Sequence, residues 1–141
     1  MLIPSGANDA VLSPAIVHVP LDRYKDNLRS MIHLLRSPES EYYSPDTAIV
    51  LMTPPPILAD YWRRQHVNWA LREGVANTAE EALKGSDRSA KVTASYAAGC
   101  VEVAENLGVQ VVDVYSGLIR AAGGTTEDAL LPFFTYCPIL H

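Results

Sequence analysis

The chain has 141 residues, of which 48% are hydrophobic and 19% are charged, and its formal net charge is −5 at pH 7. This composition is typical of a globular domain and excludes a disordered chain. The acidic balance, with no basic cluster, argues against nucleic acid and anionic membranes as partners. No apolar run reaches the roughly 18 residues that a transmembrane helix needs, so we expect no membrane span. The two cysteines, Cys100 and Cys137, do not make a disulfide framework. We therefore expect a cytoplasmic protein, with the reservation that a lost N-terminal targeting segment would not be visible.

The first third of the chain predicts a turn, a helix and a strand. Residues 6–9, Gly-Ala-Asn-Asp, are typical of a tight turn at the end of a short strand. Apolar residues then recur at helical spacing from Leu21 to Leu35, and Pro38 is expected to end that helix. The run TAIVLMT at 47–53 is typical of a strand buried on both faces, and three prolines stop it.

The middle of the chain is predicted to be mainly helical. Residues 57–74 form one helical segment, and Thr78 with Glu81 fits a capping box for a short helix. The residues GSDRS break the pattern. A longer helix follows, and Gly108 is its expected end. Its predicted buried face consists of Ala90, Thr93, Ala94, Ala97, Val101, Ala104 and Leu107.

The last third predicts another buried strand at 109–115, a helical turn at 116–124, and a short final helix with Thr126 as its cap. Strands that alternate with helices favour parallel strands with right-handed crossovers, in an α/β sheet covered on both faces. In such sheets ligands bind beyond the carboxyl ends of the strands. The candidate positions are therefore 6–9, 53–56 and 113–116.

Four blocks of sequence, in order, resemble the SGNH, or GDSL-type, hydrolases, and among them the isoamyl acetate-hydrolysing esterase-like branch. The blocks are GANDA at 6–10, VPLDRYKDNLRSMIHLL at 19–35, IVLMTPPPI at 49–57 and VAENLGVQVVDVY at 103–115. The resemblance implies that residues 1–141 form a single partial domain. The implied fold is an incomplete flavodoxin-like three-layer sandwich, with a short parallel sheet of about three strands and helices on both faces.

The resemblance also implies hydrolysis of small carboxylic esters by a serine nucleophile, without metal or organic cofactor. In the family an Asn of the third conserved block donates to the oxyanion, and Asn8 matches it by position. The family's Gly-Asp-Ser nucleophile block has no match in this sequence. Where the family has Asp-x-x-His after a segment like ALLPFFT, the chain has Tyr136 and, three residues before His141, Pro138. Nucleophile and base are therefore both predicted to be missing.

These observations predict an esterase-family chain that is truncated at both ends and catalytically incomplete, with a small ester as substrate only if completed. An alternative is a non-catalytic fragment that binds or regulates a full-length relative through an exposed sheet edge. That edge would also favour self-association. A third alternative is a different enzyme that uses Ser116 or Cys137. His66 is a candidate for substrate contact.

Overall fold

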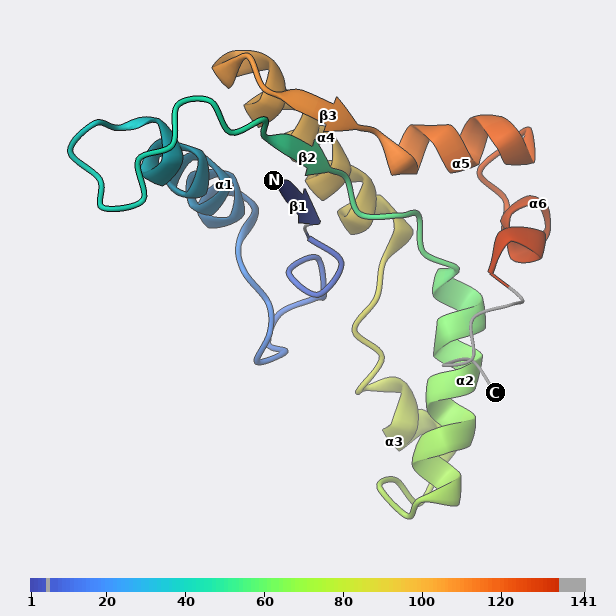
Figure 1. Cartoon of the computed structure of the whole chain (residues 1–141). Helices are drawn as coiled ribbons and strands as arrows, with labels where there is room; N and C mark the ends of the chain where they lie inside the picture. Colours follow the sequence, from blue (N-terminus) through green and yellow to red (C-terminus); the bar gives the residue numbers. More distant parts are fainter. Residues whose placement is uncertain (5, 135–141) are drawn as a thin grey trace.

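The fold is built on a short parallel sheet. The computed structural model describes residues 1–4 and 6–134, and its strands are β1 (Leu2–Pro4), β2 (Val50–Met52) and β3 (Gln110–Val112). They are hydrogen-bonded in the order β1-β2-β3, and both pairs are parallel (Figure 1). The predicted α/β class with a parallel sheet of about three strands is confirmed.

The helices divide into two groups in space. Helices α1 (Leu21–Arg36) and α4 (Ala90–Leu107) pack against each other beside the sheet, whereas the remaining helices lie beyond the carboxyl ends of the strands (Figure 1). This second group comprises α2 (Ala59–Arg72), α3 (Ala79–Leu83), α5 (Val114–Ala122), α6 (Glu127–Leu130) and the 3₁₀ turn η1 (Leu131–Phe133).

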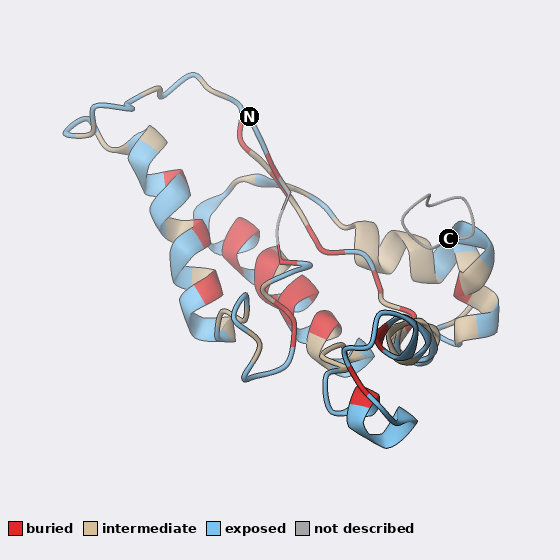
Figure 2. Ribbon diagram, turned by 90° about the horizontal axis from the view of Figure 1, so that it is seen from below, coloured by how far each residue is buried: buried red, intermediate tan, exposed pale blue. Residues whose placement is uncertain are grey.

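The main core lies between the sheet and the α1/α4 layer. Ile3, Leu51 and Val111 occupy the same register position on the three strands and pack into this core, because alternate residues of a strand face opposite sides of the sheet. Tyr24, Leu28 and Ile32 meet them from one face of α1. Figure 2 shows the resulting buried stripe running along α4 and the facing side of α1.

The other face of the sheet is largely open. Its side chains include Leu2 and Val112, which are 56% and 49% exposed. Among the described residues, helices therefore cover one face of the sheet, and the second helical layer of the expected sandwich is not formed. The prediction that 109–115 is a buried strand is wrong. The strand β3 lies at the edge of the sheet, and Gln110, like Val112, is exposed on the open face.

Local capping sets most element boundaries. The strand predicted at 109–115 ends at Val112 because the Asp113 side chain accepts a hydrogen bond from the Ser116 backbone N–H and so caps α5. Thr78 caps α3 as predicted, but the Glu81 carboxylate accepts from the Asn77 N–H and not from Thr78. Gly108 ends α4 in the left-handed conformation, with φ of 62°, as expected.

The buried face of α4 is rotated relative to the prediction. Thr93, Ala97 and Ala104 are buried as expected, but Leu107 is 44% exposed. Tyr96, Cys100 and Val103 take its place in the core. The centres of the Tyr96 ring and the Tyr24 ring of α1 lie 5.1 Å apart, so the two helices meet through a pair of large aromatic side chains. The predicted face, which consists mainly of alanines, does not include this contact.

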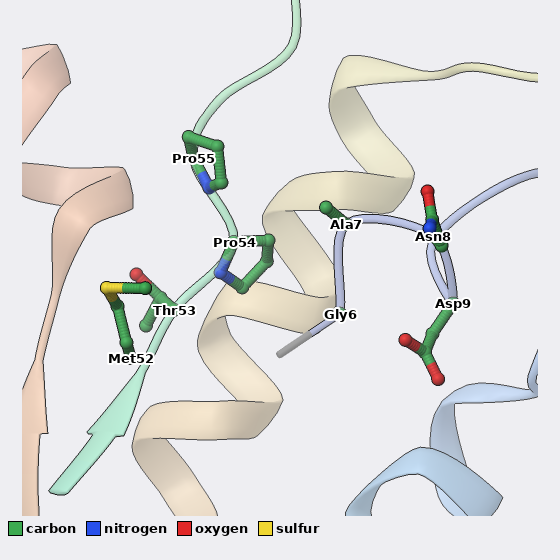
Figure 3. Close-up of a pocket in the computed structure, with 8 residues that line it drawn as sticks. All are labelled: Gly6, Ala7, Asn8, Asp9, Met52, Thr53, Pro54 and Pro55. Atoms are coloured by element: carbon green, nitrogen blue, oxygen red, sulfur yellow. The ribbon is translucent and has the colours of Figure 1, made fainter. Parts of the chain in front are cut away.

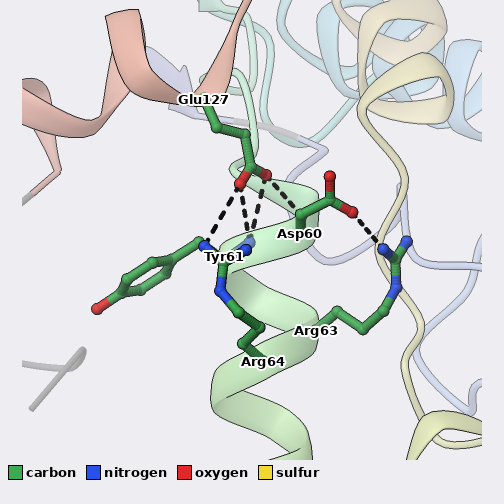
Figure 4. Close-up of polar contacts among 5 residues, drawn as sticks. All are labelled: Asp60, Tyr61, Arg63, Arg64 and Glu127. Carbon is green, nitrogen blue, oxygen red and sulfur yellow. Dashed lines mark hydrogen bonds and ion pairs between the residues drawn. The ribbon is translucent and has the colours of Figure 1, made fainter.

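A carboxylate from α6 holds the start of α2. Glu127 accepts hydrogen bonds from the backbone N–H groups of Asp60 and Tyr61, and its Oε2 lies 3.8 Å from the Arg64 guanidinium (Figure 4). A negative charge at a helix N-terminus satisfies free N–H groups and interacts favourably with the helix dipole. This contact joins elements 67 residues apart and fixes α6 against α2.

No helix within 1–4 and 6–134 is both long and apolar enough to cross a membrane.

Candidate functional site

A cavity of about 300 Å³ opens where β1 and β2 end, which is the edge of the sheet that the chain order predicts for a site (Figure 3). Two of the three predicted positions meet there. The lining residues are Gly6, Ala7, Asn8, Asp9, Met52, Thr53, Pro54 and Pro55.

One wall of the cavity is the predicted tight turn after β1. The Ala10 N–H donates to the Gly6 carbonyl at 2.9 Å, which closes the turn. Gly6 has a φ of +94° and lies against the buried Tyr24 ring of α1. Asn8 follows in the turn, is exposed, and is one of the residues that line the cavity.

The other wall of the cavity, residues 52–55, is hydrogen-bonded through Thr53 to residues 113–116, the third predicted position. This threonine is 1% exposed, and its hydroxyl donates to the Asp113 carboxylate at 3.2 Å and accepts from the Tyr115 N–H at 3.0 Å. The Thr53 backbone N–H also donates to the Val112 carbonyl. Residues 113–116 therefore brace the cavity wall from behind and do not line the cavity.

The carboxyl of Asp113 is held in its charged form. Burial raises its pKa, but hydrogen bonds from Ser116 and Thr53 and the charge of Arg120 outweigh that effect, so the pKa lies below its ordinary value. Its ionised form is therefore matched both to the N-terminus of α5 and to the Thr53 hydroxyl.

Asp113→Asn is expected to destabilise the protein at neutral pH, because the amide can still cap α5 but carries no charge for the helix N-terminus. Since the native pKa of Asp113 is lowered, its ionic contribution is complete above the ordinary value of 3.8 and is lost as pH falls through the native pKa. Urea unfolding at a series of pH values should show the difference between wild type and variant shrinking over that acidic range. A difference that grows toward low pH would contradict this assignment.

Arg88 is a site residue that the sequence did not indicate. It belongs to the break between α3 and α4, yet its guanidinium donates to the Ala7 carbonyl and to the Asn8 side-chain oxygen. It also lies 5.3 Å from the centre of the Trp62 ring of α2. The contact spans about 80 residues of sequence, so no local pattern could have revealed it.

The remaining candidate residues lie elsewhere. Ser116 donates its backbone N–H to Asp113 as part of the α5 cap, with no histidine among its described hydrogen-bond partners. His66 packs beside Gly85 and Trp69 and does not line the cavity. Cys100 is fully buried in the core. Tyr136, Cys137, Pro138 and His141 lie outside the described residues. Within the described part of the chain, no three His, Cys, Asp or Glu side chains group as a metal site.

The parallel sheet with a polar turn at its carboxyl edge defines an α/β protein, and comparison with known proteins indicates its family. The chain is 36% identical over 116 residues to a GDSL esterase/lipase of Arabidopsis thaliana. The aligned region covers 79% of this chain and 42% of the relative. It is 34% identical over 115 residues to the isoamyl acetate-hydrolyzing esterase 1 homolog of Mus musculus, covering 79% of this chain and 39% of that protein. No family model matches the chain.

These relatives support the SGNH, or GDSL-type, hydrolase family that the resemblance in the sequence predicts. The chain spans about two fifths of the length of the curated relatives that it matches. What the longer relatives do as whole proteins is therefore carried to this chain only as a proposal.

Proposed function

We propose that the chain carries the oxyanion-donor part of a serine hydrolase site for small carboxylic, acetate-type esters. The observation that carries this proposal is the position of Asn8, whose amide borders the cavity at the carboxyl edge of the sheet. The similarity of the chain to a GDSL esterase/lipase, and to a protein named for the hydrolysis of isoamyl acetate, supports the substrate class.

In acyl transfer, a hydroxyl attacks the ester carbonyl while a base takes its proton, and the oxygen that becomes negative needs donors already in place. Asn8 Nδ2 is such a donor. The eight described residues that line the cavity include no serine and no histidine, so a nucleophile and a base would have to come from outside this set. We therefore propose that the 141 residues alone are catalytically incomplete.

The test is an ester assay on the purified chain. Hydrolysis of p-nitrophenyl acetate should not exceed the rate of the Asn8→Ala variant, and a fluorophosphonate probe should label no serine. Turnover that depends on one of the chain's own side chains, or labelling of Ser116, would contradict incompleteness. Turnover that survives every such change would instead point to a contaminating esterase.

A second candidate function is that of a non-catalytic partner of a longer relative. Among the described strands, β1 pairs with β2 alone, and Met1 and Leu2 on this edge are more than half exposed. An unpaired parallel edge offers backbone donors and acceptors to an additional strand. Co-purification with a full-length homologue, lost when lysine replaces Leu2, would favour this candidate. Size-exclusion chromatography that gives only a monomer in the presence of the homologue would oppose it.

We also propose a cytosolic location. The 141 residues contain two cysteines, too few for a disulfide framework, which suits a reducing compartment. Fractionation of cells that express the tagged chain would test this.

A further inference from the structure

The Arg88 guanidinium clamps the turn that carries Asn8. Its Nη1 donates to the Ala7 backbone carbonyl, and its Nη2 donates to Asn8 Oδ1 at 3.4 Å. One planar group thus contacts the main chain of one residue and the side chain of the next. Arginine suits this role because its donors are fixed in a rigid fork, whereas lysine offers a single flexible ammonium.

The chemistry of the contact determines which end of the Asn8 amide is available to a ligand. An asparagine amide has an acceptor oxygen and a donor nitrogen of nearly equal size, and only the surrounding hydrogen bonds distinguish the two orientations. A guanidinium has donors and no acceptor, so the group that faces Arg88 must be the Asn8 carbonyl. The NH₂ group is consequently the end of the amide that does not face Arg88.

Arg88 is itself held in place before any ligand arrives. Its side chain is 19% exposed and lies over the Trp62 ring, with the guanidinium carbon 5.3 Å from the ring centre. Arg88 Nε is 3.5 Å from the Asp87 carboxylate. The Asp87 carbonyl in turn accepts from the Leu12 N–H at 2.7 Å, which ties this segment to the turn region. Cation–π contact and partial burial both restrict the motion of the guanidinium.

We propose that Arg88 is the positioning residue for Asn8, and that it fixes the side-chain amide with Nδ2 directed to the cavity as a donor for a negatively charged oxygen. The meaning of this donor rests on the proposed esterase ancestry. The orientation of the amide does not, because it follows from contacts within the chain. Arg88 touches no reacting atom in this arrangement and acts only through Asn8.

The experiment measures the Asn8 side-chain amide directly by nuclear magnetic resonance of the complete, ¹⁵N-labelled chain. The Nδ2 signals are assigned by their disappearance in Asn8→Asp. In wild type, couplings and nuclear Overhauser effects should define one amide orientation. In Arg88→Met, which keeps an apolar chain against Trp62, that single orientation should be lost. Arg88→Lys should restore it only in part.

The matched control is Arg63→Met. Arg63 is 45% exposed and pairs with Asp60 on α2, so the control removes an arginine of the same size without touching the turn. It should leave the Asn8 signals unchanged. If Arg88→Met does not fold, the reverse measurement decides: in Asn8→Ser the Arg88 guanidinium signals should shift relative to wild type, while those of Arg63 should not.

An Asn8 amide that keeps one orientation in a folded Arg88→Met chain would overturn the proposal, as would guanidinium signals indifferent to Asn8→Ser. Both readouts are taken without any ester. A failed esterase assay would therefore count against the proposed function alone, and an unaltered amide would count against Arg88 alone.

Discussion

Replacing Leu51 with alanine is expected to lower the free energy of unfolding by about 2–5 kcal/mol, the usual range for a leucine deleted from a packed core. Leu51 is the middle residue of the central strand and is 0% exposed. Its neighbours in the register, Ile3 and Val111, belong to or pack against the same core. Because β1 and β3 both pair with β2, the strand that loses its side chain is the one that holds the sheet together.

The matched control for Leu51→Ala is Val112→Ala. Val112 also lies in a strand, but it is 49% exposed on the open face of the sheet, and its truncation should change stability by only about 0.5 kcal/mol. Urea unfolding followed by circular dichroism measures both variants. Equal losses would mean that the α1/α4 side does not form the main core, and that the open face is covered in solution.

The helices could be predicted from local sequence because their signals are local. The helical spacing predicts a start at Leu21, which is the first residue of α1, and an end before Pro38, and α1 ends at Arg36. Thr78, Gly108 and Thr126 act at the ends where the sequence placed them. Each of these contacts joins residues a few positions apart, and so neighbouring letters suffice to predict it.

The layers and the site could be predicted only in part. The carboxyl-edge rule correctly brought residues 6–9 and 53–56 to one cavity, since it depends on strand direction alone. An apolar run such as the one around Val111, in contrast, does not reveal whether helices cover one face or both. The sequence did not reveal the hydrogen bonds that the Thr53 and Arg88 side chains make, because their partners, Asp113 and Asn8, are 60 and 80 residues away.

Gly6→Ala is the second substitution for which we expect a large effect, and it concerns the turn that presents Asn8. A φ of +94° is one that residues with a Cβ rarely adopt, and left-handed backbone costs such residues about 1–2 kcal/mol. At Gly6 a further cost arises from contact, because an added Cβ would lie 3.1 Å from the Tyr24 hydroxyl oxygen and 3.2 Å from its ring carbon Cζ. The Tyr24 ring is 2% exposed and packs against Tyr96, so it has little room to move.

Gly74→Ala separates the two contributions. Gly74 also has a positive φ, 69°, but an added Cβ there meets nothing within 4 Å. It should therefore show the backbone cost of about 1–2 kcal/mol alone, and Gly6→Ala should lose measurably more in the same urea titration. The Gly6 variant should in addition shift the amide signals of Asn8, because the turn can relieve the contact only by moving away from Tyr24. Equal losses in the two variants, with Asn8 unmoved, would mean that the turn is not packed on α1, and the wall of the cavity would then lack the support that fixes its shape.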